Sequence, residues 1–315
     1  MDDVLSEVNQ RANLAMSNEL EMLTFYLTDK QLYGLNVFKI IEILECPKTV
    51  TKVPHSHPAI KGTIDFRGHG ISLIDLSEAM GLPSTPFKDI VAYVLVCEYS
   101  TTTQGFLVAQ PNVLIHKSWN DIIQPDNNIY ESSYLTALTY DNDVAIQILD
   151  VEKLLSEIIG IDVEISAELV EQGRSVIRPD HHILAVDDSK AARTMLAGAL
   201  TQMGIQHTIL DNPAEALETL KRSLEEGDGR SKYTMIFTDI EMPIMDGFTL
   251  TRKVKAIEGL KDIYLAAHSS LSNKSNREKA QQMGADDFIP KFTPDRIAQA
   301  ILDQVQAADA RMGIN

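Results

Sequence analysis

The sequence lacks the features of secreted and membrane-spanning proteins. Its only cysteines, Cys46 and Cys97, lie in apolar stretches without metal-ligand spacing, so we expect two buried thiols. The longest uninterrupted apolar run, Ile90 to Cys97, has eight residues, which is too short to cross a bilayer. Asp2 and Asp3 stand where a secretory signal carries lysine. We therefore expect a cytoplasmic protein that does not insert directly into a membrane.

Basic residues are also scarce. The 28 Lys and Arg residues face 45 Asp and Glu residues, and most of the net charge of −17 lies in the first 180 residues. Because nucleic-acid binding requires a basic surface, we expect no nucleic acid among the partners. The chain has 315 residues, of which 44% are hydrophobic, and this length and composition are typical of two folded domains.

Short apolar strands alternate with helices over residues 181–315. The apolar stretch HILAVDD (182–188) precedes a helix that Ser189 begins, and Asn212-Pro213 opens the next helix. The pattern predicts a flavodoxin-like (βα)5 domain of the α/β class, with helices on both faces of a parallel sheet. Ligands of such sheets collect at the carboxyl ends of the strands.

Residues 1–165 show a different pattern, with many short strands joined by polar turns. This pattern predicts an all-β domain of small barrels, preceded by a helical segment from Asp2 to about Ser17. One expected hairpin turns at Asp141-Asn142-Asp143. Because residues 166–180 are largely polar, we predict that they form the linker between the two domains.

Polar side chains follow four strands of the predicted parallel sheet. Asp187 and Asp188 end the first strand and Asp239 ends the third, so three carboxylates converge at one edge. Two carboxylates 4 Å apart repel by about 4 kcal/mol at an effective dielectric near 20, which favours a bound Mg²⁺. Ser269 and Lys291 add two donors for a phosphoryl group. A single aspartate at a strand end is usually a cap, but this set predicts a site that forms an aspartyl phosphate.

These residues lie in motifs that resemble the receiver domain of two-component response regulators. The motifs are VDDSKAAR (186–193), FTDIEMPIMDG (237–247), HSS (268–270) and PKF (290–292). The resemblance implies that Asp239 is the phospho-acceptor. It also implies that Asp188 ligates Mg²⁺ directly, with Asp187 beside it, through water.

The same resemblance implies four further roles. A backbone carbonyl of Glu241 would bind the metal, and Ser269 and Lys291 would contact the phosphoryl group. Phe288 would be the aromatic residue that switches position together with Ser269.

The N-terminal part resembles the CheW-like adaptor domain of bacterial chemotaxis. The segments that carry the resemblance are YGLNVFKIIEI (33–43), IKGTIDFRGHGISLIDL (60–76) and ILDVEKLL (148–155). The resemblance implies a double barrel that binds the cytoplasmic tip of a chemoreceptor and a chemotaxis histidine kinase. Glu42, Arg67, Val37, Phe38 and Ile41 would lie in the contact surface, and core packing is the alternative for the three apolar residues.

The order of the two modules resembles the CheV type of chemotaxis coupling protein. This resemblance implies a signal-transduction scaffold in receptor arrays that couples chemoreceptors to the kinase. Mg²⁺-dependent phosphorylation of Asp239 would regulate it, either as an adaptation switch or as a phosphate sink. We expect no enzymatic activity beyond its own phosphoryl transfer from a phosphohistidine donor.

Two other classes of function are weighed against this one. A metal-dependent phosphatase of the haloacid dehalogenase type carries a second aspartate two residues after the nucleophile, where this chain has Glu241. A response regulator with a transcriptional output carries a basic helical module, whereas the N-terminal part here is acidic.

Overall fold

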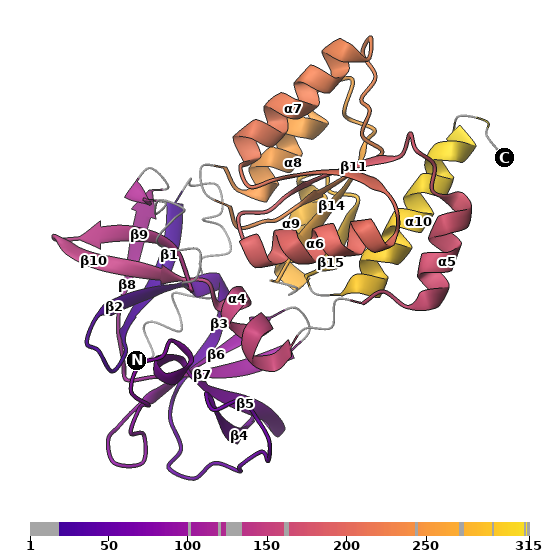
Figure 1. The fold of residues 1–315 in the computed structure, drawn as a ribbon. Helices are drawn as coiled ribbons and strands as arrows, with labels where there is room; N and C mark the ends of the chain where they lie inside the picture. Colours follow the sequence, from indigo (N-terminus) through magenta and orange to yellow (C-terminus); the bar gives the residue numbers. More distant parts are fainter. Residues whose placement is uncertain are drawn as a thin grey trace. The chain divides into compact units, whose positions relative to one another are not determined.

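The computed structural model forms two compact units, Met1–Gly160 and Ile161–Asn315 (Figure 1). It describes residues 19–99, 102–118, 121–123, 134–160, 164–242, 245–270, 274–291, 293–311 and 313. The helical segment predicted for Asp2 to Ser17 lies outside the described residues. Among the described helices, none is long and apolar enough to span a bilayer.

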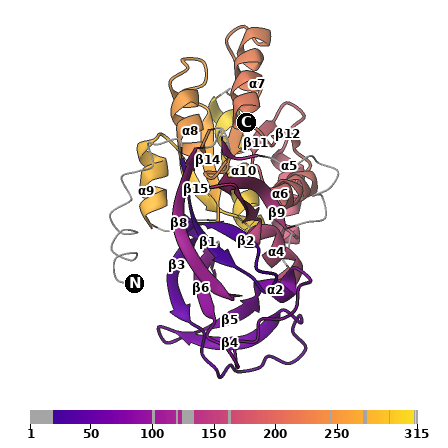
Figure 2. The same ribbon diagram turned by 90° about the vertical axis from the view of Figure 1, so that its left-hand side faces the viewer.

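The N-terminal unit contains two five-stranded sheets, which confirms the predicted all-β domain. The first sheet has the order β8 (Gln110–Ser118), β1 (Glu19–Tyr26), β2 (Leu32–Asn36), β10 (Val144–Leu149) and β9 (Leu135–Asp141). The second has the order β3 (Ile40–Glu45), β6 (Tyr93–Tyr99), β7 (Thr102–Val108), β5 (His69–Asp75) and β4 (Ile60–Phe66). Figure 2 shows β3, β6, β5 and β4 of the second sheet together. Neighbouring strands are antiparallel except for the pairs β2–β10 and β5–β7.

Short helices connect these strands and close the unit. They are η2 (Val37–Lys39), α2 (Leu76–Ala79), α4 (Val151–Leu155) and the π-helical turn η4 (Ser156–Gly160). The β9–β10 hairpin turns at Asn142 and Asp143, which adopt φ values of 46° and 63°. Asn and Asp tolerate this left-handed conformation, so the turn forms where the sequence predicts it.

One hydrophobic cluster joins the two sheets. It includes Phe25 from β1 together with Leu95 and Phe106 from β6 and β7, and all three are fully buried. Cys97 belongs to this cluster and Cys46 to a second one, so both thiols are buried as predicted. Burial raises the pKa of Cys46 to about 11.

The C-terminal unit is built on a five-stranded parallel sheet. The order is β12 (Gln206–Leu210), β11 (His182–Val186), β13 (Met235–Thr238), β14 (Tyr264–Ser269) and β15 (Asp287–Pro290). The side chains of α7 (Pro213–Glu226), α8 (Gly247–Lys255) and α9 (Lys274–Gln282) pack in one core cluster. Those of α6 (Lys190–Gln202) and α10 (Pro294–Arg311) pack in another. The α/β prediction, with both faces of the sheet covered, is thereby confirmed.

The caps that the sequence predicts for two of these helices are present. The Ser189 hydroxyl accepts a hydrogen bond from the Ala192 amide at 3.3 Å, and Asn212 Oδ1 accepts one from the Ala214 amide at 2.8 Å. Pro213 occupies the first turn of α7, where its missing amide hydrogen costs nothing. These caps start α6 and α7 immediately after the ends of β11 and β12, and so fix the loops at the functional edge of the sheet.

The stretch expected to be a linker, residues 166–180, instead contains helix α5 (Ala167–Val176), which belongs to the C-terminal unit. Its apolar residues Leu169, Val170 and Val176 pack into the cluster that α6 and α10 form. These apolar residues recur at the spacing of one helical face, and a reading by composition alone misses them because polar residues separate them.

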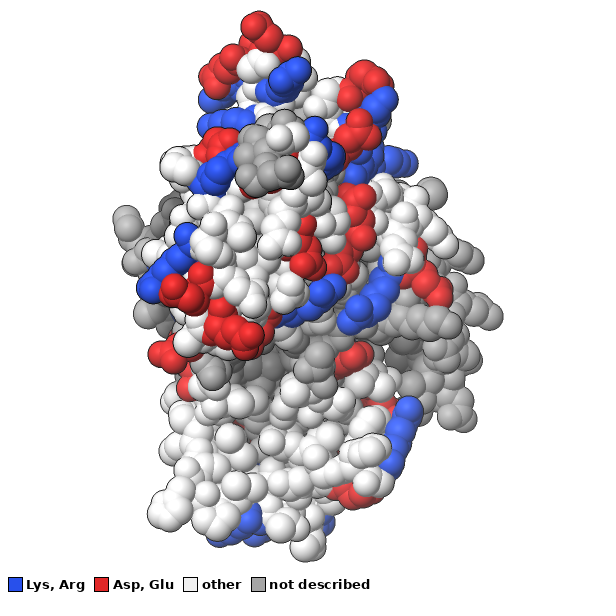
Figure 3. All heavy atoms as spheres, turned by 90° about the vertical axis from the view of Figure 1, so that its right-hand side faces the viewer, with Lys and Arg blue, Asp and Glu red and all other residues white. Residues whose placement is uncertain are grey.

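Acidic and basic side chains are interspersed over the upper part of the face drawn in Figure 3, whereas few lie in its lower part. Several oppositely charged neighbours form surface ion pairs, such as Arg296 with Asp287 at 2.8 Å and Lys255 with Asp286 at 2.7 Å. Exposed pairs of this kind stabilise a fold by at most about 1 kcal/mol each.

Candidate functional site

The parallel register of the C-terminal sheet brings the candidate residues to one edge. Val186 of β11 lies opposite Thr238 of β13, so Asp187 and Asp239, which follow them, are neighbours. The Asp239 amide donates to the Val186 carbonyl at 2.9 Å. On the far side, the Lys291 amide donates to the carbonyl of Ser269, the last residue of β14, at 3.1 Å.

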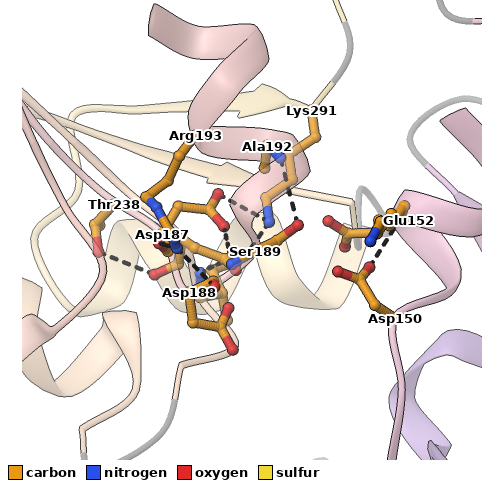
Figure 4. A network of polar contacts seen from close by, with 12 residues as sticks. Asp150, Glu152, Asp187, Asp188, Ser189, Ala192, Arg193, Thr238 and Lys291 are labelled. Carbon is orange, nitrogen blue, oxygen red and sulfur yellow. Dashed lines mark hydrogen bonds and ion pairs between the residues drawn. The ribbon is translucent and has the colours of Figure 1, made fainter. Parts of the chain in front are cut away.

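Three carboxylates and one ammonium group form the centre of this edge. Asp187, Asp188 and Asp239 each offer an oxygen, and these oxygens lie within 4.8 Å of one another. The Lys291 Nζ lies 2.9 Å from Asp187 Oδ2 and 2.9 Å from Asp239 Oδ2. Figure 4 shows Asp187, Asp188 and Lys291 side by side at the ends of the strands. The sequence prediction that these residues converge is confirmed.

Because this cluster is buried, its charges interact more strongly than they would in water. Lys291 is 1% exposed, Asp187 1% and Asp239 3%, while Asp188 is partly exposed. Carboxylates at such separations repel one another by about 3–4 kcal/mol at an effective dielectric near 20. The single ammonium group leaves two negative charges in excess, which a divalent cation would balance.

Backbone amides hold two of the three carboxylates in place. Asp239 Oδ1 accepts a hydrogen bond from the Ile240 amide at 2.7 Å, and Asp187 Oδ1 accepts one from the Ser189 amide at 2.9 Å. In each case the other oxygen, Oδ2, is the one that faces Lys291. Both carboxylates are therefore fixed in rotation, which keeps one oxygen of each directed into the cluster.

The donors at this edge fit a hard divalent cation. Carboxylate oxygens, with water and backbone carbonyls, are the ligands that Mg²⁺ takes in proteins. Asp188 is the most exposed of the three acids, so it is the one with most room to turn toward a cation. Glu241, expected to contribute a carbonyl, is half-buried in the loop that follows β13.

The other two receiver residues named from the sequence lie at strand ends or within strands nearby. Ser269 is 1% exposed at the end of β14. Phe288 is 5% exposed in β15, and the guanidinium of Arg277 lies over its ring, 5.0 Å from the centroid. The aromatic residue expected to switch thus lies inside the fold, beneath a cation from α9.

Sequence reasoning missed two residues that shape this edge. A Cβ added at Gly247 would lie 1.9 Å from the Asp239 carbonyl oxygen, so only glycine fits there. Arg193 donates to the backbone carbonyls of Asp187 and Asp188. The sequence shows Gly247 in the Asp-Gly pair at the start of α8, and it shows Arg193 one turn after the Ser189 cap. Neither position reveals such contacts.

The candidates in the N-terminal unit are only partly brought together. Glu42 Oε2 and Arg67 Nη2 lie 2.6 Å apart in an ion pair whose arginine side chain is 67% exposed. Phe38 is 42% exposed and Ile41 is partly buried. Val37 is 5% exposed within the core, which agrees with the alternative of core packing.

A two-residue turn presents Arg67 at the end of the β4–β5 hairpin. Arg67 and Gly68 have φ values of 53° and 83°, and Phe66 pairs with His69 on the two strands. The guanidinium also lies 4.9 Å from the ring centroid of Phe66. A residue other than glycine in a left-handed conformation at an exposed tip is uncommon, and here it directs the charge outward beside Glu42.

Matches to two domain families and to related protein sequences agree with this description. Residues 21–158 match the CheW-like domain, and residues 183–302 match the response regulator receiver domain. Chemotaxis protein CheV2 of Helicobacter pylori is 29% identical over 91% of this chain and 95% of that protein. For CheV1 of the same organism the identity is 28%, over 98% of this chain and 100% of that protein. The crystal structure of the scaffolding protein TtCheW from Thermoanaerobacter tengcongensis aligns with a TM-score of 0.37 and 25% identity, covering 41% of this chain and 88% of that one.

The chain thus combines a CheW-like domain with a receiver domain, in which three carboxylates and Lys291 lie at one edge of the sheet. The two domain matches and the similarity to CheV2 and CheV1 over most of the chain support a CheV-type chemotaxis coupling scaffold with a phosphorylatable receiver.

Proposed function

We propose that this protein couples chemoreceptors to a chemotaxis histidine kinase and that phosphorylation of Asp239 regulates the coupling. The observation that carries the proposal is the buried cluster in which Lys291 lies 2.9 Å from both Asp187 and Asp239, beside Asp188. The CheW-like match over residues 21–158 supplies the scaffold half of the proposal.

Asp239 is the group that we propose as the phospho-acceptor. One of its carboxylate oxygens attacks the phosphorus of a phosphohistidine on the kinase, so an O–P bond forms and the P–N bond breaks. The electron pair of the broken bond returns to the imidazole, which takes up a proton from solvent. The Ile240 amide orients the Asp239 carboxylate for this attack through its bond to Oδ1.

Lys291 and Ser269 are the groups that we propose to contact the phosphoryl oxygens. The Lys291 ammonium already lies on the Oδ2 side of Asp239, where it offsets the negative charge of an approaching phosphoryl group. Ser269 offers a hydroxyl donor at the neighbouring strand end.

Asp187 and Asp188, with a backbone carbonyl of Glu241, are proposed to hold Mg²⁺ next to Asp239. When bound, the cation neutralises charge on the transferring phosphoryl group. The proposal follows from the oxygen donors within 4.8 Å of one another and from their two excess negative charges.

The exposed ion pair of Glu42 and Arg67, with Phe38 and Ile41 nearby in sequence, is the surface that we propose for the chemoreceptor tip or the kinase. Arg67 is suited to this role because a planar guanidinium recognises polar groups at interfaces. A pair with such exposure contributes little to stability, so a partner is the better explanation of its outward direction.

Phosphorylation adds roughly two negative charges at Asp239. We propose that these charges attract the side chains of Lys291 and Ser269 and, through β15, shift Phe288. The change either alters coupling, as an adaptation switch, or drains phosphoryl groups from a competing receiver, as a phosphate sink. The protein would then act at cytoplasmic receptor arrays as a scaffold that catalyses only its own phosphorylation.

Transfer of label from a phosphorylated chemotaxis histidine kinase tests the receiver half. With Mg²⁺, the wild-type chain is expected to gain label as the kinase loses it, and Asp239→Asn is expected to stay at background because it lacks the nucleophile. Asp246→Asn is the matched control, since Asp246 caps α8 through its bond to the Thr249 amide and lies outside the cluster.

The proposal fails if the wild type gains no label while the kinase keeps it, or if Asp239→Asn is labelled as well as the wild type. Steady hydrolysis of a generic phosphate ester by the wild type would instead favour the metal-dependent phosphatase.

A further inference from the structure

Arg193 contacts the loop that carries two of the three acids of the cluster. From the first turns of α6 it reaches back, and its Nη1 donates to the carbonyl oxygens of Asp187 at 2.9 Å and Asp188 at 2.7 Å (Figure 4). Its Nη2 lies 3.9 Å from Asp211 Oδ2, in the loop after β12. One guanidinium thus holds two successive peptide carbonyls and faces a neighbouring loop.

These two carbonyls belong to the peptide units on either side of Asp188. Neither peptide plane rotates without breaking a hydrogen bond to Arg193, so the direction of the Asp188 Cα–Cβ bond is fixed through the backbone. Asp187 and Asp239 are held differently, since backbone amides bind their carboxylates directly. Asp188 is also the most exposed of the three acids, and Arg193 binds both peptide units that flank its Cα.

We infer that Arg193 is a positioning residue that sets the direction of Asp188 for the divalent cation of the phosphorylation site. The inference deepens the proposed function and rests on it. Arginine suits the task because its planar group offers donors to several acceptors at once, whereas the lysine side chain is one bond shorter and ends in a point charge.

The direction of the change in Mg²⁺ affinity when Arg193 is replaced distinguishes a positioning role from a purely electrostatic one. Arg193 is cationic, and a positive charge near a cation site weakens cation binding by Coulomb repulsion. If the charge were what mattered, its removal in Arg193→Met would therefore tighten Mg²⁺ binding. Loss of positioning has the opposite effect, and loss of groups that orient metal ligands typically costs 10- to 100-fold in metal affinity.

The experiment is a calorimetric titration of the full-length protein with Mg²⁺ at fixed ionic strength. We expect Arg193→Met to bind Mg²⁺ about tenfold more weakly than the wild type. Arg193→Lys, which keeps the charge, should also bind more weakly. Arg222→Met, which removes an exposed arginine from α7, is the matched control and should bind as the wild type does.

A second measurement follows the rate of labelling by acetyl phosphate as Mg²⁺ is raised. The Mg²⁺ concentration at half-maximal rate should rise about tenfold in Arg193→Met, in line with the lost affinity, while the rate at saturating Mg²⁺ stays within about twofold of the wild type. Unfolding followed by circular dichroism checks the fold. If Arg193→Met has no cooperative transition, Arg193→Lys carries the test.

The possible results distinguish a failure of the positioning role of Arg193 from a failure of the proposed function. Wild-type binding together with equal or tighter binding by Arg193→Met overturns this inference and leaves the proposed function intact. So does a lower rate at saturating Mg²⁺ with unchanged affinity, because Arg193 would then act on the phosphoryl group. A wild-type chain that binds no Mg²⁺ overturns the proposed function, and this inference with it.

Discussion

Individual residues at the acidic edge have little freedom to vary because backbone and side chains are close together there. Gly247 is the clearest case, since a Cβ would come within 1.9 Å of the Asp239 carbonyl oxygen and 2.9 Å of the Ile240 Cα. The Gly247 amide also donates to the Ile240 carbonyl at 2.9 Å. The segment from Asp239 to Gly247 therefore closes on itself directly behind the proposed phospho-acceptor.

Gly247→Ala is expected to disturb this closure. The added methyl group has no room without a backbone shift, so we expect the free energy of unfolding to fall by about 1–3 kcal/mol. Phosphorylation should also slow, because Asp239 shares the displaced backbone. Urea unfolding and the labelling assay measure the two effects.

Gly198→Ala in α6 is the matched control. A Cβ at Gly198 meets nothing within 4 Å, and alanine stabilises a helix interior by about 0.5–1 kcal/mol relative to glycine. If both variants gain stability alike, Gly247 does not pack as described.

At the scale of elements, helix α5 makes this receiver domain larger than its βα repeats alone. The two residues before α5 are held by hydrogen bonds, from the Ile165 amide to Gln202 Oε1 at 3.0 Å and from the Ser166 amide to Asp295 Oδ1 at 2.8 Å. After its end, Arg178 and His181 both contact Asp309 of α10, at 2.7 and 2.9 Å.

Ile165→Ala tests whether this element is an integral part of the domain. Ile165 is 6% exposed in the cluster shared with α6 and α10, so truncation should lower the free energy of unfolding by about 2–5 kcal/mol. Ile159→Ala removes the same atoms from a residue that is 48% exposed, and its effect should stay within about 0.5 kcal/mol. Equal effects of the two truncations, measured by urea unfolding, would mean that residues 164–177 behave as a linker.

The elements differ in how far the sequence predicts them. The strands of the parallel sheet and the helices that cover it have local sequence signals. Apolar runs such as 182–186 predict the strands, and N-cap residues such as Ser189 and Asn212 predict the helix starts. Their order places Asp187, Asp239 and Lys291 at one edge. Helix α5 is harder to recognise because polar residues interrupt its apolar face. Ser166 stands at its N-cap position but makes no side-chain cap bond.

Contacts that depend on tertiary packing are not predictable in this way. Neither the carbonyl contacts of Arg193 nor the close approach of Gly247 to Asp239 follows from local pattern, because each depends on how a loop folds back on itself. Val37 is another residue whose burial does not follow from the local sequence pattern. Its neighbours Phe38 and Ile41 are more exposed, while Val37 itself is buried. Val37 and Phe38 share a short 3-10 helix, in which Val37 is the buried residue.

For the whole molecule, two functions are combined in one chain. The CheW-like unit presents an exposed Arg67–Glu42 pair, and the receiver unit presents a buried acidic cluster with Lys291. Coupling through the first unit should survive the loss of Asp239, because the nucleophile belongs to the second unit. Phosphoryl transfer should survive the loss of Arg67 for the same reason.

The most direct measurement is the activity of a chemotaxis histidine kinase in receptor-containing membranes as the protein is added, with label on both proteins followed at the same time. We expect wild type and Asp239→Asn both to raise receptor-dependent kinase activity above the level in buffer, with label appearing on the wild type only. Arg67→Ala should accept label but couple more weakly, whereas Arg174→Ala, at another exposed arginine, should resemble the wild type. Kinase activity no higher than in buffer, at any concentration of the wild type, would contradict the assignment of this protein as a coupling scaffold.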